Sequence, residues 1–288
     1  MKLRFENILI PVDFSINTDV AIKKAISLSA GSKVSIHFLH VVEPTQATVF
    51  SFYQFAKYLI SDRISRITRA QEKLECLKHY FLNANKDAEV FSWVVHGLPI
   101  EESIIRKATL LDVDMIVLGK NSHHSILPFL NTVVPSKIAR KTGIAVFTVK
   151  PGAADHAIRT VVVPVGISFP EKKLAVISEL RKAFNIHIRL VSFVRNDRFL
   201  PAPLLDAYQF LKENPANNVG YKLLKGKNKG RAILRYCQRI NADLLVVYPE
   251  TETKIGWLNS HMSDALPVQS RTQILAIGPE IDIRKKKN

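Results

Sequence analysis

The sequence predicts an α/β protein built from two tandem, doubly wound sheets of five parallel strands each. Three observations lead to this fold class. The length of 288 residues suits two domains of roughly 150 residues. Short apolar runs alternate with amphipathic stretches, and several motifs return at about half the length of the chain. Helices between apolar strands form right-handed crossovers, which produce parallel sheets.

Three segments return later in the chain in the same order. ILIPVDFS at 8–15 returns as VVVPVGIS at 161–168, an offset of 153 residues. DMIVLG at 114–119 returns as DLLVVY at 243–248, an offset of 129, and AVFTVKP at 145–151 returns as QILAIGP at 273–279, an offset of 128. Since the order is kept while the spacing shrinks, the second copy is shortened in its middle. The predicted domains are 1–151 and 156–282, joined by a turn-rich linker and followed by a basic tail, 283–288.

Each copy contains five predicted strands. They are 8–12, 34–42, 89–95, 115–119 and 145–149 in the first copy, and 160–165, 187–194, 220–224, 244–247 and 274–277 in the second. Many of these runs are apolar on both faces, as expected of strands covered by helices on each side. Helical patterns occupy 19–30 and about 52–82 in the first copy. In the second copy the long helix shrinks to 203–212, which accounts for the missing residues.

Composition excludes several classes of protein. With 47% hydrophobic and 23% charged residues, the chain has enough apolar material for sizeable cores, so disorder is not expected. No run approaches the roughly 18 apolar residues of a spanning helix, and the first residues lack a signal-peptide pattern. Cys76 and Cys237 suggest neither a disulfide framework nor a zinc site, and helical patterns around both favour small core residues. These features predict a reduced, cytoplasmic setting and no membrane partner.

A parallel sheet of this kind binds ligands at the carboxyl ends of its strands, where the strand order switches. In the first copy that edge carries Asp13-Phe14-Ser15 after the first strand and Gly119 after the fourth. An acceptor at Asp13 suits the exocyclic amine of a base, and backbone N–H groups after Gly119 suit a phosphate. The alternatives are a strand-end aspartate that caps the following helix and a plain strand-exit glycine.

The residues IPVDFS at 10–15, DMIVLG at 114–119 and VFTV at 146–149 together resemble the universal stress protein family. HGLP at 96–99 followed by Ile104 fits the family's Gly-x-Pro before its third helix. The resemblance covers the first copy and, more faintly, the second. It implies an adenine nucleotide alpha hydrolase-like fold with strand order 3-2-1-4-5 in each copy. It also implies pairing of the last strands, either within the chain as a pseudo-dimer or between the chains of a homodimer.

Nucleotide-binding members of the family carry Gly-x2-Gly-x9-Gly-Ser/Thr after the fourth strand. Gly119 matches the first glycine, but Ser122 stands at the second, Thr132 at the third and Val133 at the hydroxyl residue. A Cβ at a former glycine hinders close approach of the backbone to phosphate. Ser125, Asn131 and Thr132 are the candidates to compensate. The phosphate end of the site is therefore predicted to be eroded.

At the base end, the resemblance places Asp13 at the family's adenine-contacting aspartate and Val41 at its usual backbone contact. In the second copy Gly166 replaces the aspartate, and Tyr248-Pro249-Glu250 replaces the start of the glycine loop. ATP or AMP is thus expected in the first copy alone, as a ligand rather than a required cofactor.

The net charge of +16 is distributed unevenly. Residues 1–150 carry +6 (19 basic, 13 acidic) and residues 151–288 carry +10 (22 basic, 12 acidic). No acidic residue occurs between Asn214 and Ala242, and a candidate anion-binding surface there comprises Lys227, Lys229, Arg231, Arg235 and Arg239. The three arginines are four apart and share one helix face. A solvated face that aids solubility is favoured over nucleic-acid contact, which stays open.

No nucleophile elbow, paired-carboxylate motif, P-loop or metal cluster stands out. His37 and His40 are three apart on a strand and point to opposite faces, which suits a metal poorly. The sequence therefore predicts a non-enzymatic stress-response binding or regulatory protein, with weak adenine-nucleotide binding in the first copy. The alternatives are polyanion binding through the basic surface and slow ATP hydrolysis.

Overall fold

A computed structural model describes residues 5–42, 52–120, 133–193, 200–213, 218–248, 254–255, 260–261, 266–267 and 269–278. The first half of the chain contains β1 (Asn7–Val12), α1 (Ile16–Ser29), β2 (Ser35–Val42), α2 (Phe52–Ala84), β3 (Glu89–His96), α3 (Ile100–Leu110), β4 (Met115–Gly119), α4 (Pro135–Thr142) and β5 (Ala145–Val149). A 3-10 turn (Pro151–Ala153) leads into the second half.

The second half repeats this alternation. It contains β6 (Thr160–Pro164), α5 (Glu171–Ala183), β7 (His187–Phe193), α6 (Ala202–Lys212), β8 (Asn218–Leu224), α7 (Lys229–Arg239), β9 (Leu244–Val247) and β12 (Gln273–Ala276). Its helix α6 has 11 residues, where the first half has α2 with 33. A small antiparallel pair, β10 (Lys254–Ile255) and β11 (Ser260–His261), comes between β9 and β12 in the chain but forms a separate sheet. This pair was not predicted. The ten predicted strands are confirmed, with ends shifted by two residues at most.

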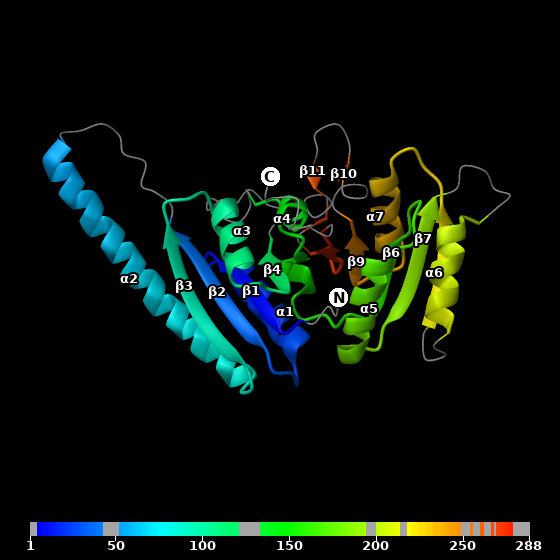
Figure 1. The fold of residues 1–288 in the computed structure, drawn as a ribbon, viewed down its shortest axis with the longest axis horizontal. Helices are drawn as coiled ribbons and strands as arrows, with labels where there is room; N and C mark the ends of the chain where they lie inside the picture. The colour runs from blue at the N-terminus through cyan, green and yellow to red at the C-terminus, as the bar shows by residue number, and fades with distance from the viewer. Residues whose placement is uncertain are drawn as a thin grey trace, which may run out of the picture.

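One sheet of ten strands runs through the molecule in the order β3-β2-β1-β4-β5-β12-β9-β6-β7-β8 (Figure 1). Each half therefore has the predicted order 3-2-1-4-5, and within each half the paired strands are parallel. The two five-stranded sheets meet where β5 pairs with β12, antiparallel, with Phe147 opposite Leu275. The last strands thus pair within the chain, one of the two arrangements that the sequence left open.

Two hydrophobic layers cover the sheet, and both extend across the two halves. Side chains of α1, α2, α5 and α6 pack on one face, where Phe38, Phe81 and Phe147 are fully buried. Side chains of α3, α4 and α7 pack on the other face. Because both faces are covered, the strands can be apolar throughout, as the sequence showed.

Each half contains the same hydrogen-bonded clamp, made by the aspartate that opens the repeated DMIVLG and DLLVVY motifs. In the first half, Oδ2 of Asp114 accepts from the backbone N–H groups of Glu6 (3.1 Å) and Asn7 (2.9 Å). In the second, Oδ2 of Asp243 accepts from those of Arg159 (3.0 Å) and Thr160 (2.8 Å). Each aspartate directly precedes the fourth strand of its half, and its side chain holds the backbone at the start of the first strand.

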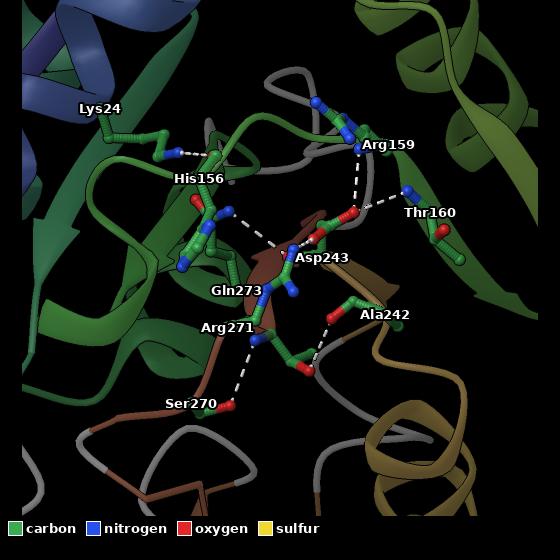
Figure 2. Close-up of polar contacts among 10 residues, drawn as sticks. Lys24, His156, Arg159, Thr160, Ala242, Asp243, Ser270, Arg271 and Gln273 are labelled. Atoms are coloured by element: carbon green, nitrogen blue, oxygen red, sulfur yellow. Dashed lines mark hydrogen bonds and ion pairs between the residues drawn. The ribbon is translucent and has the colours of Figure 1, made fainter.

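Figure 2 shows the second clamp where it meets the seam between the halves. Oδ1 of Asp243 lies 3.4 Å from Nη2 of Arg271, and the Asp243 side chain is nearly fully buried. Lys24 of α1 reaches the same region, where its ammonium donates to the carbonyl oxygen of His156 at 2.8 Å. The helix α1 is therefore anchored to the segment that joins the two halves.

One expectation about the cysteines is wrong. Cys237 is buried on α7, as predicted, but Cys76 on α2 is exposed. The buried face of α2 runs through Ala70, Leu74 and Phe81, and Cys76 falls outside that row. In a 33-residue helix at the end of the sheet, only one narrow face meets the core, so a helical pattern alone did not locate the thiol.

Candidate functional site

Asp13 lies directly after β1 and organises the turn into α1. Its Oδ1 accepts from the backbone N–H of Ser15 (3.0 Å), the hydroxyl of Ser15 (2.6 Å) and the hydroxyl of Thr18 (2.8 Å). Ser15 is the N-cap of α1 and accepts from the N–H of Asn17. The local role that the sequence left open is therefore present. It uses one carboxylate oxygen, while Oδ2 is 3.5 Å from Nδ2 of Asn17.

The sheet register brings the base-end residues to one edge. Val12 pairs with His40, so Asp13, the first residue after β1, lies level with Val41, the second-last residue of β2. Ile8 pairs with Met115 on β4, and the same offset brings Val12 level with Gly119. β1 lies between β2 and β4 and is the strand from which the order switches. The structure therefore gathers Asp13, Val41 and Gly119 at the switch point.

Gly119 is required by packing at this edge. A Cβ on Gly119 would overlap the backbone carbonyl of Asn17, in the first turn of α1. The helix start thus lies directly over the end of β4, which only a glycine permits. This close approach supports the reading of a strand-exit glycine and also brings the N-terminal turn of α1 to the crevice.

Three further side chains lie near Asp13: Phe14, which the sequence already placed at this edge, and His40 and Lys73, which sequence reasoning did not assign to the site. Phe14 adopts a positive φ of 57°, and its ring centroid lies 4.6 Å from that of His40. Nδ1 of His40 lies 2.8 Å from the carbonyl oxygen of Val12, so Nδ1 carries the proton and donates. The ammonium of Lys73, from α2, lies 5.1 Å from the Phe14 centroid. No sequence pattern brings His40 and Lys73 together with Asp13, because His40 lies on β2 and Lys73 on α2.

Burial is the main cause that lowers the pKa of His40, while Lys73 and Arg66 lower it further and Asp13 raises it in part. The imidazole is therefore neutral at pH 7. Together with Phe14, whose ring is tilted by 41° to the imidazole, it forms an aromatic pair beside a carboxylate. Such a surface suits the face of a base better than a phosphate.

The phosphate end is only partly described. Ser122, Asn131 and Thr132 lie outside the described residues, as do His123 and His124. Val133, at the position of the family's hydroxyl residue, is buried in the core formed with α3 and α4. The ammonium of Lys120, itself buried, donates to the carbonyl oxygen of Val133 at 3.1 Å. The two ends of the loop are thus fastened together, and Val133 contributes no group to a ligand.

In the second half, the matching crevice holds a side chain of the protein itself. Lys173 of α5 is fully buried, and its ammonium donates to the carbonyl oxygen of Pro164, at the end of β6, at 2.6 Å. The same ammonium lies 4.3 Å from the ring centroid of Tyr248, directly after β9. Gly166 stands where the first half has Asp13. A lysine therefore occupies the switch point between β6 and β9.

The candidate anion surface is exposed along its whole length. Its five members are Lys227, Lys229, Arg231, Arg235 and Arg239, the last four on α7. The opposite face of α7 packs on the sheet through Ile233, Leu234 and Cys237. This surface and the first crevice belong to different halves of the molecule.

Metal and membrane features were also sought. Within the described ranges, no group of three or more His, Cys, Asp or Glu is placed to hold a metal ion. His37 packs on Phe91 and accepts from the indole N–H of Trp93 (3.2 Å), away from His40. None of the helices in the described part of the chain is long and apolar enough to cross a membrane.

A sequence model of the Universal stress protein family matches residues 4–150 of this chain. No curated protein matches the sequence. Among solved structures, a universal stress protein from Archaeoglobus fulgidus superposes with a TM-score of 0.67 at 16% identity, covering 97% of this chain and 99% of that one.

Two other solved structures span nearly the whole chain. A putative universal stress protein from Pseudomonas aeruginosa gives a TM-score of 0.53 at 13% identity, covering 96% of this chain and 95% of that one. The cytoplasmic domain of a prokaryotic cation chloride cotransporter gives 0.54 at 12% identity, covering 95% of each chain. At such identities these likenesses show the fold alone.

Proposed function

This chain belongs to the universal stress protein family, and on that premise we propose that it is a non-enzymatic binding or regulatory protein of the stress response. In this proposal the first half binds an adenine nucleotide, ATP or AMP, weakly and without requiring it as a cofactor. The observation that carries the proposal is the convergence of Asp13, Val41 and Gly119 at one switch point.

The contacts around Asp13 support a ligand with a flat base. Oδ1 of Asp13 is used by Ser15 and Thr18, which fixes the carboxylate, and Oδ2, with a long 3.5 Å contact from Nδ2 of Asn17, is the oxygen proposed to accept from an exocyclic amine. Phe14 and His40 supply an aromatic pair beside it. A rigid acceptor next to an aromatic surface discriminates in favour of adenine more than it contributes affinity.

The phosphate end contributes little in this proposal. Val133 is buried and the ammonium of Lys120 is bonded to its carbonyl oxygen, so the contacts left for phosphates are those of the loop that carries Ser122, Asn131 and Thr132. ATP and AMP should therefore bind with similar affinity. The second half takes no nucleotide, because Lys173 fills its crevice.

The cytoplasm is the proposed location, and the partners proposed are small: an adenine nucleotide and, within the chain, the other half of the pseudo-dimer. A homodimer of whole chains is compatible with the fold, in which β3 and β8 form the two edges of the sheet. No catalytic group is proposed in either crevice.

Calorimetric titration with ATP and AMP tests the proposal. We expect both to bind, with dissociation constants within about threefold of each other. Asp13→Asn keeps an oxygen for Ser15 and Thr18 while removing the charge, so it should weaken binding without unfolding the turn. Asp87→Asn, at an exposed position of the same half, is the matched control and should leave binding unchanged.

Mass spectrometry of protein purified without added ligand supplies a second readout. A bound adenine nucleotide would support the proposal directly. No heat and no thermal shift with millimolar ATP or AMP, together with an Asp13→Asn variant that behaves as wild type, would show that the first half does not bind nucleotide.

A further inference from the structure

The helix α7 carries a distribution of charge that lowers the stability of a helix. Its N-cap is Asn228, whose side chain accepts from the N–H of Arg231 at 3.0 Å, and its first turn carries Lys229 and Arg231 with no acidic residue. Cations at a helix N-terminus oppose the helix dipole. Arg231, Arg235 and Arg239 then repeat at four-residue intervals, where like charges repel.

The corresponding helix of the first half follows the opposite pattern. The helix α3 opens with Glu101 and Glu102 and carries Lys107 in its last turn. Glu101 is also paired with Lys137 of α4 at 2.6 Å. Both helices pack on the same face of the sheet, so the fold itself does not demand the basic sequence of α7.

The charges of α7 are not balanced within the part of the chain that the structure describes. None of the ion pairs there includes Lys227, Lys229, Arg231, Arg235 or Arg239. Two of these side chains lie near aromatic rings instead: Lys229 is 5.7 Å from the centroid of Phe193, and Arg239 is 5.4 Å from that of Tyr236. The helix N-terminus adds further positive potential at the same end. The surface is therefore built to attract an anion.

We propose that α7 and the preceding loop bind the phosphate backbone of a nucleic acid. The surface is purely electrostatic, which separates this partner from two others. A membrane-binding helix inserts apolar side chains, and a protein interface needs an apolar or aromatic centre. The apolar side chains of α7 are spent on the sheet, and none of the large hydrophobic residues found exposed in the described chain lies on this helix. Guanidinium groups at three positions suit phosphate oxygens.

The binding is independent of sequence and of the crevice in the first half. Five cations that each neutralise one phosphate give a salt slope of about −4.5 on duplex DNA. Affinity should then fall about 500-fold between roughly 50 and 200 mM salt. The proposal does not rest on nucleotide binding, so either can fail without the other.

Fluorescence anisotropy of the full chain with a labelled DNA duplex of about 30 base pairs tests it. The variant Arg231→Gln, Arg235→Gln, Arg239→Gln should reduce the salt effect to about 12-fold, because two contacts remain. The matched control Lys33→Gln, Lys86→Gln, Arg106→Gln removes the same charge from exposed positions of the first half and should leave the slope unchanged. Replacing the three arginines by lysine keeps the positive charges and should therefore leave the salt slope unchanged as well.

Thermal melting of each variant verifies that the fold is intact, which is expected because the three arginines are exposed. An unchanged slope in the α7 variant, or an equal loss in the control, would overturn the proposal. So would tighter binding to vesicles containing phosphatidylserine, or to polyglutamate, than to the duplex at the same salt concentration.

Discussion

The two switch points of this molecule have the same architecture and opposite contents. In the first half, Asp13 is fixed by Ser15 and Thr18 beside an aromatic pair, and its second oxygen has only a long contact, 3.5 Å, from Nδ2 of Asn17 in the described chain. In the second half, Gly166 replaces that aspartate, and Lys173 bridges Pro164 and Tyr248 across the crevice. The topology creates a crevice in both halves, but the local side chains decide whether it stays available to a ligand or is filled from within.

The largest expected difference between the two crevices is the effect on stability of replacing a glycine by alanine in each. Gly119→Ala places a Cβ against the carbonyl of Asn17, and we expect a loss of about 3 kcal/mol or more in the free energy of unfolding. At Gly166 a Cβ would meet nothing within 4 Å, so Gly166→Ala should change stability by less than about 1 kcal/mol. Urea denaturation measures both. Equal effects would contradict the close packing of α1 over Gly119 and the open space at Gly166.

Each half buries a lysine at a position where the other half has an apolar residue. For Lys24 of the first half, the dependence of stability on pH tests this difference. Burial lowers the pKa of Lys24 to about 8, while Asp155 and Asp243 raise it in part. The folded protein binds this proton less tightly than the unfolded chain, whose lysine titrates near 10.5. Stability should therefore rise between about pH 8 and 10.5, by up to about 3 kcal/mol.

Lys24→Ile copies Ile177, the residue 153 positions later on α5, and should flatten that rise. Lys23→Gln, at an exposed neighbour, should keep it. Denaturation midpoints measured across this pH range give the answer. A slope that survives Lys24→Ile would assign the titration to another group.

The smallest expected effect concerns Lys173. Lys173→Val copies Val20, the residue 153 positions earlier, and leaves the carbonyl of Pro164 without the ammonium that donates to it. We expect a loss of about 2 kcal/mol, the cost of an unsatisfied buried acceptor. Lys172→Val, one residue away, is the control for the helix propensity of valine and should cost less than about 1 kcal/mol. No loss in Lys173→Val would show that the lysine does not hold the second crevice together.

Much of the fold could be predicted because its signals are local. Strands apolar on both faces, such as 115–119 and 145–149, were recognisable as runs, and the resemblance to the universal stress protein family implied the strand order. Asp13 and Gly119 followed from their positions after strands. The buried lysines were not predictable: Lys173 stands in the charged opening Glu171-Lys172-Lys173, and its contacts, Pro164 and Tyr248, come from two other segments. His40, on β2, was not assigned to the site for the same reason.

The seam between β5 and β12 joins inside one chain what a homodimer would join between two. In a symmetric dimer, every substitution is made twice and alters both crevices at once. Here each half has its own codons, so a substitution at position 166 leaves Asp13 unchanged. Covalent fusion therefore lets selection act on one crevice while the other serves as scaffold. The same independence of the two halves permits the difference in charge between α3 and α7.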